Sequence, residues 1–129
     1  MRRVAQNFAV RRGVIVSPTA SSLVLTGLPM PPIAHGAARS YPARYHAWRS
    51  AASWQVRLQG ARRVRGSVAI AITLEEGASR VDLGALAKAP IDLLCELQLI
   101  EGDHREVIRE VSLRWGQVRG LRIDVRSAP

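Results

Sequence analysis

A stretch near the middle of the chain, residues 64–74 (VRGSVAIAITL), places the strongest constraint on the fold. Apolar residues alternate along it with small or polar ones, and a period of two is that of a β-strand. Its apolarity predicts a strand at the centre of a sheet. The other elements are therefore expected to pack around that sheet.

The residues before this strand predict one more strand and one helix. Residues 22–28 (SLVLTGL) predict the first strand, which ends at a proline-rich segment because proline cannot donate a hydrogen bond to a neighbouring strand. Residues 41–60 predict a helix, with Pro42 in its first turn and Gly60 as the signal for its end.

The residues after the central strand predict a second helix and two further strands. Residues 82–97 predict the helix, with Asp82 as its N-cap, and Pro90 predicts either a kink or a late helix start. Residues 107–115 and 121–125 predict two strands paired as a terminal hairpin. The order β-α-β-α-β-β indicates a single small α/β domain with a mixed sheet.

Size and composition limit the class of protein. The chain has 129 residues, of which 47% are hydrophobic, enough for one compact domain, expected over residues 21–129 after a basic N-terminal extension, residues 1–20. No apolar run approaches the roughly 18 residues of a membrane span, and one cysteine excludes an internal disulfide framework. We therefore expect a cytoplasmic protein with no membrane partner.

The charged residues are distributed unevenly. Residues 1–74 contain eleven arginines and no carboxylate, whereas residues 75–129 contain eight basic residues and all ten acids. A basic half without acids suits a polyanion such as nucleic acid. The alternative is an ordinary solvated surface from an arginine-rich proteome. Lys88, the one lysine among 19 basic residues, lies among the acids.

Three side chains in the acidic half have the chemistry of phosphodiester cleavage. Asp82 is expected at the start of a helix, Lys88 within it and Asp103 in the turn after it. Magnesium takes one or two carboxylates in proteins and lowers the pKa of a bound water. A lysine beside such a site can stabilise the negative charge that develops on phosphate.

Each of these residues also has a purely structural interpretation. Asp82 can serve as a helix cap alone, Asp103 as a turn residue, and Lys88 with Asp92 as a surface ion pair. His104 is expected to be an exposed turn residue, with metal ligand or base as the alternative. Two further expectations concern the core, which should contain Cys95 and at least one of Trp48 and Trp54.

Four segments together resemble the RusA family of Holliday-junction resolvases. Residues 80–94 (RVDLGALAKAPIDLL) resemble the family's signature, and residues 99–103 (LIEGD) resemble the turn that carries its later catalytic aspartate. Residues 28–32 (LPMPP) are similar to its N-terminal proline segment, and residues 45–49 (YHAWR) to the start of its first helix. The resemblance covers about residues 22–126, in order.

The resemblance implies a homodimeric, Mg²⁺- or Mn²⁺-dependent endodeoxyribonuclease that nicks four-way DNA junctions in recombination and repair. Asp82, Lys88 and Asp103 match its catalytic residues, with Asp82 and Asp103 holding the metal. The candidates for a DNA-binding surface are six of the arginines in the basic half: Arg39, Arg44, Arg49, Arg62, Arg63 and Arg65.

The sequence departs from the signature at two positions. Gly84 stands where the family has its second aspartate, and Ala85 where it has an asparagine. Two interpretations follow: a junction-binding protein that has lost cleavage, or an active enzyme in which two carboxylates suffice, or in which Asp92, Glu101 or His104 replaces the missing ligand. A third hypothesis is a basic subunit with an acidic protein partner.

Overall fold

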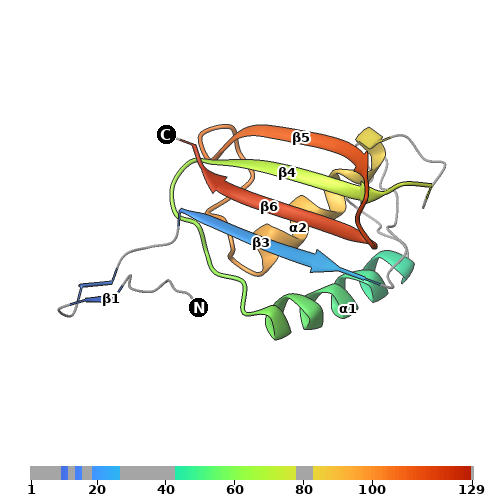
Figure 1. Ribbon diagram of the computed structural model, residues 1–129, viewed down its shortest axis with the longest axis horizontal. Helices are drawn as coiled ribbons and strands as arrows, with labels where there is room; N and C mark the ends of the chain where they lie inside the picture. The colour runs from blue at the N-terminus through green and yellow to red at the C-terminus, as the bar shows by residue number, and fades with distance from the viewer. Residues whose placement is uncertain (1–9, 12–13, 16–18, 27–42, 78–82, 129) are drawn as a thin grey trace.

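The computed structural model describes residues 10–11, 14–15, 19–26, 43–77 and 83–128. These residues form a small α/β domain with a mixed four-stranded sheet and two α-helices (Figure 1). The strands of the sheet are β3 (Ala20–Leu25), β4 (Val68–Glu75), β5 (Ile108–Gly116) and β6 (Leu121–Ser127). Two short strands, β1 (Val10–Arg11) and β2 (Val14–Ile15), pair separately within the expected N-terminal extension.

The order of strands in the sheet is β3-β6-β4-β5. β6 is antiparallel to both of its neighbours, and β4 is parallel to β5. The expected central strand is confirmed, because β4 has a neighbour on each side and its residues from Val68 to Leu74 are buried apart from Ala71. The predicted start at residue 64 is wrong, because the chain bends at Gly66, where φ is +75°, and β4 begins only at Val68.

The predicted terminal hairpin is wrong. β4 lies between β5 and β6, so these two strands do not pair. The connection between them crosses the end of β4, where the backbone N–H groups of Glu75 and Glu76 donate to the carbonyls of Gly120 and Gly116. The largely buried β4 takes the interior position between β5 and β6, where backbone groups along both of its edges are hydrogen-bonded.

The first helix, α1 (Ala43–Gln59), is confirmed within the residues that the structure describes. The second helical segment is divided into a short 3₁₀ helix, η1 (Leu83–Leu86), and α2 (Lys88–Glu96). Pro90 is the third residue of α2, a position whose N–H has no partner within a helix, so the expected late start is confirmed.

The predicted N-cap of this helix is wrong, because Ala87 caps α2 without a side-chain hydrogen bond. The α-helix starts again after η1, so the cap position moves five residues beyond Asp82. Asp82 itself lies outside the described residues, as do Arg39 and the proline-rich segment 29–32.

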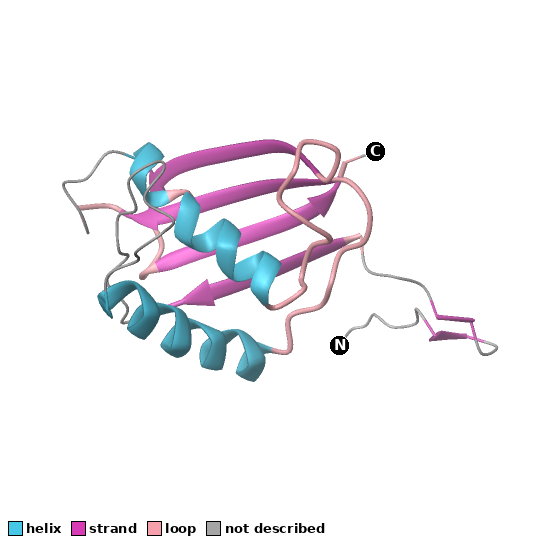
Figure 2. Ribbon diagram, turned by 180° about the vertical axis from the view of Figure 1, so that it is seen from behind, coloured by secondary structure: helices cyan, strands magenta, loops and turns pink. Residues whose placement is uncertain are grey.

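Both helices cover the same face of the sheet (Figure 2). Buried residues of β6 (Leu121, Ile123 and Val125) face the helices, and they alternate with Arg122, Asp124 and Arg126. The core between the layers includes Tyr45, Trp48 and Leu93 from the helices. The other face of the sheet has no helix of the described chain over it. The charged residues of β6 alternate with its buried residues and therefore project to this open face.

Candidate functional site

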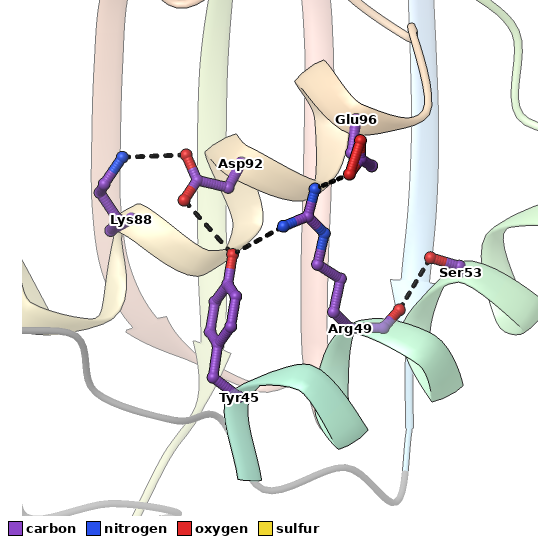
Figure 3. Close-up of polar contacts among 6 residues, drawn as sticks. All are labelled: Tyr45, Arg49, Ser53, Lys88, Asp92 and Glu96. Atoms are coloured by element: carbon purple, nitrogen blue, oxygen red, sulfur yellow. Dashed lines mark hydrogen bonds and ion pairs between the residues drawn. The ribbon is translucent and has the colours of Figure 1, made fainter. Parts of the chain in front are cut away.

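Lys88 and Asp92 form the centre of a polar cluster between α1 and α2 (Figure 3). They lie one turn apart on α2, and Lys88 Nζ is 3.0 Å from Asp92 Oδ1. The second carboxylate oxygen, Oδ2, accepts a hydrogen bond of 3.3 Å from the hydroxyl of Tyr45 on α1. The Tyr45 side chain is buried, and the side chains of Lys88 and Asp92 are 43% and 16% exposed. Asp92 therefore pairs with Lys88 through one carboxylate oxygen and accepts a hydrogen bond from the buried Tyr45 through the other.

Arg49 extends this cluster along the two helices. Its Nη1 donates to the Tyr45 hydroxyl at 3.5 Å, its Nη2 pairs with Glu96 of α2, and its guanidinium lies 5.9 Å from the centre of the Tyr45 ring. Arg49 was expected on a DNA-binding surface. The structure places it in an ion pair that joins α1 to α2, with its side chain 24% exposed.

Asp103 lies at the other end of α2 from Lys88. Lys88 begins the helix, and Asp103 is in the loop that follows its last residue, Glu96. The helix between these ends is roughly 12 Å long. The structure therefore does not bring Lys88 and Asp103 together within one chain. Among the described residues there is also no group of three or more acidic, histidine or cysteine side chains placed to hold a metal ion.

The negative charge of Asp103 affects the pKa of the Cys95 thiol on α2. Partial burial raises the pKa of the Cys95 thiol, and the charges of Asp103 and Asp92 raise it further, against the opposing effect of Lys88. The thiol is half-buried rather than fully in the core. His104 is exposed and its Nδ1 pairs with Glu106 at 3.1 Å, as expected for a turn residue.

The tryptophans divide as expected, since Trp48 is in the core and Trp54 is 65% exposed. No helix in the described part of the chain is both long and apolar enough to cross a membrane.

The remaining DNA-binding candidates lie at the two ends of α1. Arg44 is exposed in its first turn, whereas Arg62 and Arg65 are exposed in the loop that leads to β4. The helix between them is roughly 25 Å long. Arg63 is half-buried, and its Nε is buried without a partner in the described chain. α1 itself contains no acidic residue, and these arginines lie at or just beyond its two ends rather than in one compact patch.

A second polar site, which the sequence did not indicate, lies on the open face of the sheet. It is a pocket of about 490 Å³ beside the connection between β5 and β6, and Thr73, Arg114, Arg122 and Asp124 line it. Charged residues at alternate positions of β6 were a signal for an exposed face. The pocket itself depends on the strand order, which brings β5 and β6 to either side of β4.

No protein-family model matches the chain, and no curated protein matches it.

Proposed function

We propose that this chain is a metal-dependent endodeoxyribonuclease of the RusA type, which acts in the cytoplasm as a homodimer on four-way DNA junctions. One observation carries the proposal. The chain's one lysine, which matches the lysine of the RusA signature, begins α2 and is held by Asp92, itself anchored by the buried Tyr45. A cation fixed in this way loses less conformational freedom when it binds phosphate than a free lysine side chain would.

In the proposed reaction, Lys88 binds the scissile phosphate and offsets the charge that develops on it. Asp92 orients the ammonium group and remains a positioning residue. The exposed arginines at the two ends of α1, Arg44, Arg62 and Arg65, supply attraction for the DNA backbone.

Mg²⁺ or Mn²⁺ would supply an activated water for hydrolysis, with Asp82 and Asp103 as the proposed ligands. The described residues provide one of these carboxylates, Asp103, which is exposed and lies away from Lys88. The described residues do not by themselves form a complete metal site.

A second candidate function is junction binding without cleavage, and Gly84 favours it. Gly84 replaces the second aspartate of the signature, and a Cβ built at this position would meet no atom of the described residues within 4 Å. The described part of the chain therefore leaves room for a Cβ here, so the glycine removes a possible ligand where its own packing does not require a glycine. This observation makes Gly84→Asp a direct test between the two functions.

The test is a cleavage assay on an end-labelled four-way junction, with Mg²⁺, Mn²⁺ or EDTA and a linear duplex of equal length. Wild-type protein should produce paired, metal-dependent nicks in the junction and none in the duplex, whereas Asp82→Asn and Lys88→Gln should bind the junction without cutting it. Normal cleavage by Asp82→Asn would refute the assignment.

Gly84→Asp distinguishes an active enzyme from one that has lost cleavage. If only Gly84→Asp cuts, the natural chain is a junction-binding protein. Ala85→Asp is the matched control, because it adds the same charge one residue further along η1. If Ala85→Asp restores cutting equally, cutting depends on the added negative charge and not on its position at residue 84.

A further inference from the structure

Two arginines stand in one row across the open face of the sheet. Thr73 of β4 is the register partner of Arg114 on β5 and of Arg122 on β6. Register partners project from the same face, and neighbouring strands are about 4.8 Å apart, so the two arginines flank a small residue with their Cα atoms roughly 10 Å apart. Two like charges in this arrangement repel each other, and an anion bound between them would offset the repulsion.

Each of the two guanidinium groups is held through its Nε atom. Arg114 Nε donates to Thr73 Oγ1 at 3.1 Å, and Thr73 is buried. Arg122 Nε donates to both carboxylate oxygens of Asp124, at 3.1 and 3.0 Å. Within the described part of the chain, the Nη atoms of Arg114 and Arg122 have no hydrogen-bond partner. The four Nη groups remain available as donors, and guanidinium groups bind phosphate oxygens in bidentate fashion.

Asp124 compensates only part of this positive charge. Partial burial alone would raise its pKa, but hydrogen bonds from Arg122 and Ser22, together with the charges of Arg122 and Arg114, lower the pKa below its ordinary value. The carboxylate is therefore ionised at neutral pH and already bonded on both oxygens. Two arginines against one aspartate leave the pocket with a net positive charge.

The space between these groups is kept open by a glycine. Gly116 lies in the next row of the same face, opposite Glu75, and lines the pocket. A Cβ at position 116 would lie 2.7 Å from the Cγ2 atom of Thr73. Any side chain there would push against the floor of the pocket.

We propose that this pocket binds a phosphate group of the nucleic-acid backbone, held between Arg114 and Arg122. The inference rests on the nucleic-acid part of the proposed function and is independent of whether the chain cuts its substrate. The same donors fit free inorganic phosphate, and the experiment below separates the two sources.

The experiment measures binding of a fluorescent four-way junction by anisotropy, in EDTA, over a range of salt concentrations. Arg114→Gln should weaken binding and lower the slope of log K against log salt by about 1, because one phosphate contact is lost. The ratio of wild-type to Arg114→Gln affinity should then fall about threefold between roughly 50 mM and 200 mM salt. Asp124→Asn should tighten binding, because it removes the competing negative charge and keeps an oxygen acceptor for Arg122.

Arg105→Gln is the matched control, since it removes the same charge from an exposed turn before β5, at the opposite end of that strand from Arg114 and outside both proposed DNA-binding regions. Circular dichroism and thermal melting of each variant check that the fold is intact. If Arg114→Gln has no more effect than Arg105→Gln, or if Asp124→Asn weakens binding, the pocket is not a phosphate site for nucleic acid.

Failure of the two proposals can be told apart. If wild-type protein binds no DNA, both proposals are refuted. If wild-type protein binds the junction but Arg114→Gln and Arg105→Gln have equal effects, only the pocket is refuted. A third outcome concerns free phosphate. If inorganic phosphate raises the melting temperature of wild-type protein but not of Arg114→Gln, and these two proteins bind DNA equally, the pocket is a site for free phosphate and the proposed occupant is wrong.

Discussion

Replacing Asp92 by alanine should destabilise the domain by about 2 kcal/mol, because two interactions are lost that differ in burial. The pair with Lys88 is an i,i+4 contact in which the lysine is 43% exposed, and it contributes about 0.3–0.5 kcal/mol. The hydroxyl of Tyr45 belongs to a fully buried side chain and would lose its hydrogen bond to the Asp92 carboxylate. A hydrogen bond to a charged group contributes about 1.5–3 kcal/mol, so the tyrosine contact dominates the total.

A double-mutant cycle isolates that contact. Tyr45→Phe keeps the buried ring, removes the donor and should cost about 1 kcal/mol, since Asp92 retains Lys88 and partial access to water. In the double variant, phenylalanine no longer needs the acceptor that Asp92→Ala removes. The double variant should therefore lose about 1 kcal/mol less than the sum of the two single variants.

Urea unfolding followed by circular dichroism measures these free energies, with an unchanged m-value as the condition for comparing them. Glu96→Ala is the control, because it breaks an ion pair whose glutamate is 56% exposed and should cost only about 0.5 kcal/mol. Additive losses in the cycle, or an Asp92→Ala variant as stable as Glu96→Ala, would show that the Tyr45 hydroxyl and the carboxylate do not stabilise one another.

Two further predictions concern the open face and its edges. Gly120→Ala should cost roughly 3 kcal/mol or more, because φ is +88° and the new Cβ would lie 2.1 Å from a backbone oxygen of β3. Gly60→Ala should cost only about 1 kcal/mol, because φ is +66° but no atom of the described residues lies within 4 Å of the new Cβ. Equal losses measured by urea unfolding would rule out the clash. In the folded protein the pKa of Asp124 lies below its ordinary value of 3.8, so the unfolded chain binds a proton at this group more readily. The stability that Asp124 contributes is therefore present above pH 3.8 and is lost as the pH falls below that value. Asp124→Asn should therefore flatten the acid limb of stability against pH, and an unchanged limb would contradict the shift.

The local elements could be predicted from the sequence because their signals are local. The alternation in residues 64–74 and the position of Pro90 both act through neighbouring backbone groups, and both expectations are confirmed. The pairing of β5 with β6 was predicted from a short connection alone. The structure inserts β4 between them, an arrangement that depends on which strand buries most apolar surface and not on the turn.

The candidate sites follow the same division. The spacing of Lys88 and Asp92 indicated their ion pair, but not the third partner, Tyr45, which α1 brings from far along the chain. The arginine row was not predictable, since Arg114 and Arg122 become neighbours of Thr73 only in the observed strand order.

The two proposed phosphate-binding regions lie on different faces of the sheet, and this separates their effects on different DNA molecules. Lys88 and the basic ends of α1 belong to the helix layer, whereas Arg114 and Arg122 belong to the open face. A short duplex can lie on one face at a time, so removing either region should lower its affinity by only about twofold while the other still binds. A four-way junction has arms that can reach both faces of one domain.

The double variant Arg44→Gln with Arg114→Gln should therefore weaken junction binding by the product of the two single effects. Each single variant should weaken junction binding more than it weakens duplex binding. If Arg114→Gln weakens duplex and junction binding equally, the open face does not contribute to junction selectivity, even if it binds phosphate.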